Sequence, residues 1–248
     1  MFHTTHALVL REARYKEADR ILTLFTDTDG KITAKARGAL RKSSRTAAAT
    51  QQLTYSEMIL FGNRGRWTVN EASLIESFTG LRADIERFVL GSYFAECIET
   101  FSVEDQPDAA LLQLGLNSLY ALSCGNYNPV EVKAAFEVRL MGIAGYEPDL
   151  SACLVCGMEE PEDPVLCLED GGICCRSCRK PSIGMGVELD SASLAAFRFV
   201  LSAPAKQMLS FRLEGRSLSL FSAAAERYLL LHAERGFSTL NYWKKIKS

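Results

Sequence analysis

The chain lacks any apolar run long enough to span a membrane, and it has little net charge. Its formal net charge is −2 over 248 residues, so the chain as a whole has no basic character. No targeting peptide is recognisable, and we therefore expect a cytoplasmic protein. A phosphate-binding loop of the form G-x-x-x-x-G-K-[S/T] is also missing, which argues against nucleotide hydrolysis of the P-loop type.

Histidines are scarce as well. The chain has only His3, His6 and His232, and none lies in a pattern typical of a nucleophile, a catalytic triad or a catalytic metal site. The cysteine pairs described below are not accompanied by the H-x-E motif of zinc deaminases. We therefore expect that this protein is not an enzyme.

The composition is that of an ordinary globular protein, but the charges are unevenly distributed. Hydrophobic residues make up 48% of the chain and charged residues 23%, enough for one large domain or two modest ones. Residues 1–80 hold 12 Lys and Arg against 8 Asp and Glu, whereas residues 81–248 hold 16 against 22. A basic first third joined to an acidic remainder is typical of proteins that contact nucleic acid.

Four of the eight cysteines have the spacing of a structural zinc site. They form two C-x-x-C pairs with eighteen residues between them: Cys153, Cys156, Cys175 and Cys178. Two residues between thiols let both sulfurs turn onto one ion, and four thiolates leave no open position for water. The spacing predicts one structural Zn²⁺ per chain, held by these four cysteines.

Other uses of the cysteines stay open. Disulfides are disfavoured in a reducing compartment, and a redox C-x-x-C should open a helix after a strand, whereas Cys153 follows a turn-like segment. Cys174 is an alternative ligand, but only Cys175 keeps two residues before Cys178. The cysteines in apolar runs are expected to be small buried side chains, and these are Cys97, Cys124 and Cys167.

Residues 1–80 are predicted to form a small antiparallel barrel. Segments rich in β-branched and aromatic residues alternate with turn signals. They predict strands at residues 6–14, 21–26, 31–37, 53–61 and 67–77. Five short strands in about 75 residues favour a closed barrel.

The predicted third strand leads into a basic loop. Six basic residues occur before the next acid, Glu57, and they are Lys31, Lys35, Arg37, Arg41, Lys42 and Arg45. A basic strand face that continues into a basic loop can neutralise phosphates, so we expect these six residues to bind DNA. The alternative is a solvated loop that is merely positive. Four aromatic residues are candidates for base stacking or for the barrel core, namely Phe25, Tyr55, Phe61 and Trp67.

From residue 81 the apolar pattern has a helical period. It predicts helices at residues 81–101, 110–123, 129–145, 190–202 and 217–235, with a short one after Pro204. The cysteine segment is predicted to be an insertion at residues 149–181 within a helical domain of residues 81–248. The expected fold class is α+β, with an N-terminal OB-fold β-barrel followed by an all-helical domain that carries an inserted four-cysteine zinc knuckle.

Several short motifs follow one another along the chain. Besides the cysteine pairs they are YKEADRILTLFT at residues 15–26, RGALRKS at 37–43, AGYEP at 144–148 and YLLLH at 228–232. In this order the chain resembles the RecO family of bacterial recombination mediators over essentially its whole length. Two positions depart from the family pattern: Arg37 stands where lysine is common, and Cys174 stands where an apolar residue is usual.

The resemblance implies an OB-fold domain that binds single- and double-stranded DNA. RecO-like proteins anneal complementary strands coated with single-stranded DNA-binding protein (SSB) and, with RecR, promote RecA loading. The implied partners are DNA, RecR and SSB, with RecF and RecA as indirect partners, in the bacterial cytoplasm at the nucleoid. Two competing hypotheses are a zinc-stabilised helical interaction module without DNA-annealing activity, and a thiol redox sensor that uses Cys174 and Cys175.

Overall fold

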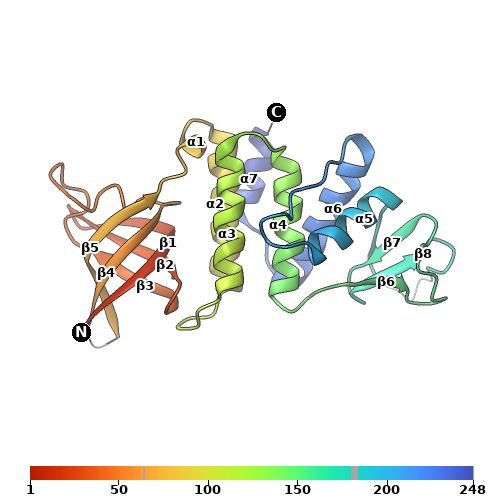
Figure 1. The fold of residues 1–248 in the computed structure, drawn as a ribbon, viewed down its shortest axis with the longest axis horizontal. Helices are drawn as coiled ribbons and strands as arrows, with labels where there is room; N and C mark the ends of the chain where they lie inside the picture. The colour runs from red at the N-terminus through yellow and green to blue at the C-terminus, as the bar shows by residue number, and fades with distance from the viewer. Residues whose placement is uncertain (64, 180–183, 248) are drawn as a thin grey trace. The chain divides into compact units, whose positions relative to one another are not determined.

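The computed structural model describes residues 1–63, 65–179 and 184–247, which form two compact units (Figure 1). The first unit contains Met1–Gly125 together with Phe237–Ser248, and the second contains Asn126–Gly236. No helix in the described part of the chain is long and apolar enough to cross a membrane.

The N-terminal part of the first unit is a closed, OB-like barrel of five strands. These are β1 (Phe2–Tyr15), β2 (Asp19–Thr26), β3 (Gly30–Ala36), β4 (Tyr55–Asn63) and β5 (Arg66–Glu76). Their order around the barrel is β1-β2-β3-β5-β4, and only the β3–β5 pairing is parallel. The predicted closed barrel of five strands is therefore confirmed, but the prediction that it is antiparallel is wrong for the β3–β5 pairing.

Alternation along the strands separates a barrel core from an outer face. On β3, Ile32, Ala34 and Ala36 are buried in the core, which places Lys31, Thr33 and Lys35 on the outer face. A register shift between Val9 and Arg11 on β1 brings the end of that strand onto the same outer face. The residues that share this face at the end of β1 are Arg11, Ala13 and Tyr15, opposite Thr23, Ile21 and Asp19 of β2.

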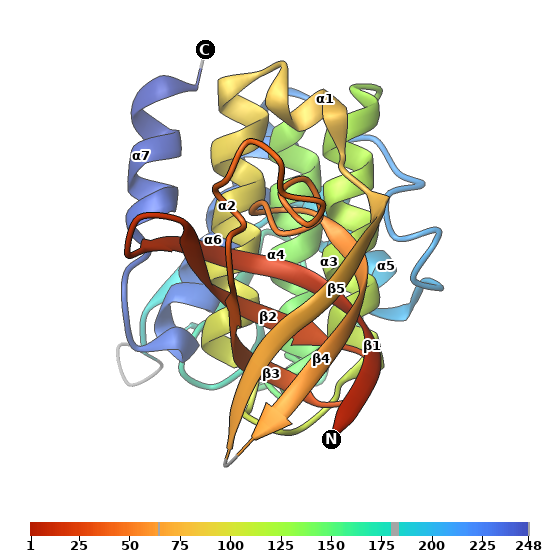
Figure 2. The same ribbon diagram turned by 90° about the vertical axis from the view of Figure 1, so that its left-hand side faces the viewer.

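Figure 2 shows the course of the loop between β3 and β4. Hydrogen bonds hold this loop to the barrel. Arg20 Nη1 donates to the carbonyl of Ala47 at 2.9 Å and to Thr50 Oγ1 at 3.0 Å. Ser56 Oγ donates to the carbonyl of Ala49 at 2.9 Å. This arginine is only 11% exposed and also pairs with Glu12, so it stabilises the loop from within the fold.

Four helices complete the first unit: α1 (Thr79–Arg82), α2 (Ile85–Phe101), α3 (Ala109–Cys124) and α7 (Ser238–Ile246). The helix predicted at residues 81–101 is broken because Asp84 caps α2, accepting from the backbone N–H groups of Glu86 and Arg87. Helix α7 was not predicted. It packs against α2, where Tyr93 meets Phe237 edge-on and Thr239 Oγ1 donates to Glu96 at 2.5 Å.

The second unit combines three helices with a small sheet. The helices are α4 (Pro129–Ile143), α5 (Ser191–Ser202) and α6 (Gly215–Ala233). The strands are β6 (Asp149–Cys153), β7 (Pro164–Cys167), β8 (Gly172–Cys175) and β9 (Gly186–Glu188), in the order β6-β8-β7-β9. The short helix predicted after Pro204 is wrong, since residues 205–209 form turns.

The predicted sequence boundaries differ from the packing units. The prediction separates residues 1–80 from 81–248 where strands give way to helices, whereas packing groups the barrel with α1, α2, α3 and α7. The predicted end of the cysteine insertion, residue 181, lies outside the described residues. The boundary near residue 80 stays a prediction about sequence domains.

Candidate nucleic-acid interface and candidate metal centre

The structure brings the four predicted cysteines of the two C-x-x-C pairs together. Cys153 ends β6 and Cys175 ends β8, and the two strands lie side by side in parallel. The turn that follows each strand carries the second cysteine of its pair. The sulfurs of all four, Cys153, Cys156, Cys175 and Cys178, lie within 4.8 Å of one another.

This geometry suits a tetrahedral metal ion. An ion bound to sulfur at about 2.3 Å places neighbouring sulfurs about 3.8 Å apart. The Cys156 and Cys175 sulfurs are 3.6 Å apart, and these cysteines are all free thiols. The group could therefore hold one metal ion, and four sulfur ligands are a set that zinc favours.

The electrostatics of the group also fit a cation. Burial opposes ionisation of Cys153, but backbone N–H groups, including that of Cys175 at 3.3 Å, lower its pKa to about 6. Burial and hydrogen bonding to Cys156 raise the pKa of Cys175 to about 12. Without a cation, one ionised sulfur opposes ionisation of its neighbours, and a bound cation would remove that opposition.

Cys174 is not a member of this group. Its buried thiol packs beside Cys167 and Cys153, so it borders the group without being one of the four cysteines whose sulfurs meet. Burial and its contact with Cys167 raise the pKa of Cys174 to about 12, which makes its thiol a poor nucleophile. Cys97 and Cys167 are buried as expected, but Cys124 is exposed at the C-terminus of α3, so that expectation was wrong.

Two of the six predicted DNA-binding residues are bound to protein acceptors. Lys31 Nζ donates to the carbonyls of Glu99 and Ser102, both at 3.0 Å, where its charge complements the C-terminus of α2. Lys35 Nζ lies 2.9 Å from Asp19 Oδ2. The pKa of Asp19 is below its ordinary value because the backbone N–H of Gly38 and the Lys35 ammonium bind its carboxylate.

The other four predicted residues are exposed on the β3–β4 loop: Arg37, Arg41, Lys42 and Arg45. Among the described residues, no carboxylate or carbonyl accepts a hydrogen bond from their side chains. The loop is joined to the β1–β2 turn, because Leu40 N–H donates to the Ala18 carbonyl and Gly38 N–H to Asp19 Oδ1. The contribution of all six residues to DNA binding stays a prediction.

The aromatic candidates differ in how accessible they are. Phe25 is fully buried, and Trp67 packs against the barrel core. Phe61 is 38% exposed and pairs with Phe2 at 5.3 Å between ring centres. Tyr15, which is 42% exposed on the outer face, was not predicted as a candidate, because its motif gives no sign of which way the ring points.

A cleft of about 330 Å³ lies farther along the same outer face. It is lined by Arg11, Thr23, Thr33 and Trp67, and it is bordered by the acidic residues Glu99, Glu104 and Asp105. Arg11 donates to Glu99 Oε1 at 3.0 Å. The acids make this end of the face less favourable for phosphates than the end that carries Tyr15 and Lys35.

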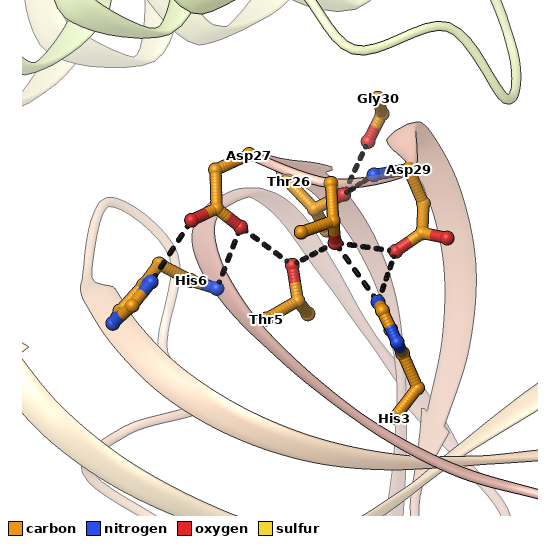
Figure 3. Close-up of polar contacts among 8 residues, drawn as sticks. His3, Thr5, His6, Thr26, Asp27, Asp29 and Gly30 are labelled. Atoms are coloured by element: carbon orange, nitrogen blue, oxygen red, sulfur yellow. Dashed lines mark hydrogen bonds and ion pairs between the residues drawn. The ribbon is translucent and has the colours of Figure 1, made fainter.

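Two histidines join β1 to the β2–β3 turn through carboxylates (Figure 3). His6 Nδ1 pairs with Asp27 Oδ2 at 2.9 Å, and His3 Nε2 lies 2.9 Å from Thr28 Oγ1 and 2.8 Å from Asp29 Oδ2. Since Thr28 and Asp29 share one ring nitrogen, His3 cannot relay a proton between them as the histidine of a catalytic triad does. These contacts are typical of a structural connection.

The chain matches family models along almost its full length. Residues 1–78 match the model described as Recombination protein O N terminal, and residues 82–241 match the model described as Recombination protein O C terminal. A protein of Acetivibrio thermocellus named DNA repair protein RecO is 32% identical over 98% of this chain and 96% of its own. Proteins of the same name from Heliobacterium modesticaldum and Symbiobacterium thermophilum are 33% and 29% identical, each over 99% of this chain and over 89% and 98% of their own. The N-terminal model covers the barrel, and the C-terminal model covers the cysteine group. This chain therefore belongs to the recombination protein O family.

Proposed function

We propose that this DNA repair protein binds single- and double-stranded DNA through the outer face of its barrel. The observation that carries the proposal is the cluster of four exposed cations on the β3–β4 loop, which are Arg37, Arg41, Lys42 and Arg45. Hydrogen bonds hold this loop to the barrel, so the cations are presented on an ordered surface. Such contacts to phosphates are independent of sequence and weaken as salt rises.

The same surface supports strand annealing as the activity. Two complementary strands repel each other through their phosphates, and a protein surface that neutralises phosphates lowers this barrier. The family adds the finer proposal that the strands are coated with SSB and that, together with RecR, the protein promotes loading of RecA. RecF is proposed to act only indirectly.

We further propose that the cysteine group holds one structural zinc ion and that the protein makes and breaks no covalent bonds. Zinc would supply a rigid crosslink between the two C-x-x-C turns, because four thiolates leave no position for a reacting water. The segment between the two C-x-x-C pairs is rich in acids, including Glu159, Glu160, Glu162 and Asp163, which argues against DNA contact there. The ion would therefore stabilise the second unit.

Annealing of complementary strands precoated with SSB, followed across a salt series, tests the proposal. We expect the protein to speed annealing, with an effect that fades as salt rises. Arg41→Ala with Lys42→Ala should slow annealing, whereas Lys206→Ala with Arg216→Ala should not, although it removes the same charge from exposed sites in the second unit. A protein that binds neither bare nor coated DNA would overturn the proposal.

A second candidate is a zinc-stabilised interaction module without annealing activity. It is favoured by exposed apolar side chains on the first C-x-x-C turn, where Leu154, Val155 and Met158 are 46%, 49% and 53% exposed. Exposed apolar groups next to acids are common where proteins meet. A DNA-binding measurement separates the two candidates, because the interaction module requires no affinity for DNA.

A further inference from the structure

We propose that Tyr15 is a stacking platform for an unpaired base, which would let this surface distinguish single-stranded from double-stranded DNA. The inference rests on the proposed DNA-binding function and assigns one residue of that surface to the base rather than to the phosphate. Tyr15 is the last residue of β1, and this residue is 42% exposed on the outer face of the barrel.

Two lysines lie next to this ring. Lys35 Nζ is 4.9 Å from the ring centre and Lys16 Nζ is 5.6 Å from it. Lys35 is held in place by Asp19, whereas Lys16 is exposed in the β1–β2 turn. A base that took the place of Lys16 on the ring would leave this ammonium next to the sugar–phosphate backbone.

The backbone of the turn supports this arrangement. Lys16 has a positive φ of 56°, a left-handed conformation that is unfavourable for a residue with a side chain. Backbone outliers of this kind are often retained at binding sites. Here the conformation reverses the chain directly after Tyr15, so the ring stands at the rim of the barrel.

One exposed cation of the β3–β4 loop, Arg41, is linked to the ring through a series of contacts. Tyr15 is directly opposite Asp19 in the β1–β2 ladder, and Asp19 accepts from the Gly38 N–H at 2.8 Å. The Arg41 side chain folds back over Gly38. A strand with one base on Tyr15 would therefore have its neighbouring phosphates next to Lys35, Lys16 and Arg41.

The proposed contact requires single-stranded DNA. In a duplex both faces of each base are covered by its neighbours, whereas a single strand can offer a base to an aromatic ring at little cost. Phosphates are present in both forms. Stacking on Tyr15 would thus strengthen binding of single strands and leave duplex binding to the cations.

The test compares Tyr15→Ala, Tyr15→Phe and a control, Tyr120→Ala, which removes an exposed tyrosine from α3 of the same unit. Fluorescence anisotropy with an oligo-dT strand and a duplex of equal length gives both affinities. We expect Tyr15→Ala to weaken single-strand binding about 5- to 150-fold, with duplex binding and the salt slope unchanged. Tyr15→Phe keeps the ring and should keep both affinities, as should the control.

Three other outcomes would overturn the proposal in distinguishable ways. Equal losses on single strands and duplex for Tyr15→Ala would mean that the ring only positions lysines. Unchanged single-strand binding would place stacking elsewhere while leaving the proposed DNA-binding function intact. Wild-type protein that binds neither form would remove both proposals together.

Discussion

The six basic residues between positions 31 and 45 fall into two groups by their contacts. Lys31 and Lys35 bind acceptors of the protein itself, so part of their charge is already compensated. The exposed loop residues have no such compensation among the described residues. We therefore expect the loop residues to dominate the electrostatic part of DNA binding.

The salt dependence of binding tests this division. Each phosphate that a cation neutralises contributes about 0.7 to 0.9 to the slope of log affinity against log salt. Arg41→Ala with Lys42→Ala should flatten the slope by about 1.5 units, as measured by anisotropy titrations at several salt concentrations. Lys206→Ala with Arg216→Ala is the charge-matched control, and an unchanged slope in the loop variant would place the DNA site elsewhere.

At the residue scale, the sequence predicted which face of a strand a side chain occupies, but not which groups that side chain contacts. Alternation along β3 correctly placed Lys31 and Lys35 on the outer face, but it could not show that Glu99, Ser102 and Asp19 bind them. These acceptors are far along the chain or on a neighbouring strand. For the same reason the sequence could not separate buried Phe25 from exposed Tyr15. Phe25 lies opposite Lys31 and Tyr15 opposite Asp19, so both rings are on the outer face, and only contacts with the rest of the unit determine which one is covered.

At the scale of elements, the β2–β3 turn depends on a glycine that fits against another segment. Gly30 has a positive φ of 66°, and a Cβ there would lie 2.1 Å from the Gln106 carbonyl oxygen in the α2–α3 loop. Asp105 N–H in that loop donates to the Lys31 carbonyl. The turn and the loop are therefore packed backbone against backbone.

Gly30→Ala should destabilise the first unit through both effects. We expect a loss of roughly 2–5 kcal/mol in the free energy of unfolding, from the left-handed backbone and from displacement of the loop. Gly65→Ala is the matched control, because Gly65 has a φ of 73° but nothing within 4 Å of the added Cβ. It should lose only about 1–2 kcal/mol in denaturant titrations. Equal losses of unfolding free energy in the two variants would show that the close approach of Gly30 to Gln106 does not contribute to stability.

The cysteine segment gives a second test at this scale. Cys153→Ser removes one ligand, so we expect loss of the bound ion and of about 3 kcal/mol or more, a fall in Tm of roughly 6–12 °C. Calorimetry and a metal-release assay would measure both, with exposed Cys124→Ser as the control. Full thermal stability without the ion would contradict a structural role.

Helices and strands were predictable where one period of apolar residues continued over many positions. The prediction failed for short helices and strands. The zinc spacing anticipated the meeting of the cysteines, but strands of three to five residues such as β6 and β9 carry too little pattern to be recognised. Helix α7 was missed because Gly236 resembles a C-terminal signal and only nine residues follow in the helix. Its buried residues, Leu240 and Trp243, are spaced as one helical face requires.

For the whole molecule, the two candidate sites lie in different compact units. The predicted DNA-binding residues and Tyr15 belong to the first unit, and the four cysteines belong to the second. Each unit has its own buried residues, including Leu22 and Leu24 in the barrel and Phe197 and Phe221 between α5 and α6. Damage to one site should therefore leave the local structure of the other intact.

Removal of the metal tests this independence. Treatment with a chelator under reducing conditions should lower Tm, yet single-strand affinity and its salt slope should stay within about twofold at a temperature where the protein remains folded. Anisotropy before and after chelation, followed by restoration with zinc, makes the comparison within one sample. Loss of DNA binding that zinc restores would instead assign the cysteine segment a part in that activity.

The place of α7 in the chain has a consequence for biosynthesis. A ribosome releases the barrel first and the whole second unit next, but the helix that covers the Tyr93 region of α2 comes after both. Since domains fold as units while the chain is being made, the second unit can be finished while the first still waits for its last helix. An apolar face of α2 therefore stays uncovered by α7 while residues 126–236 are being translated.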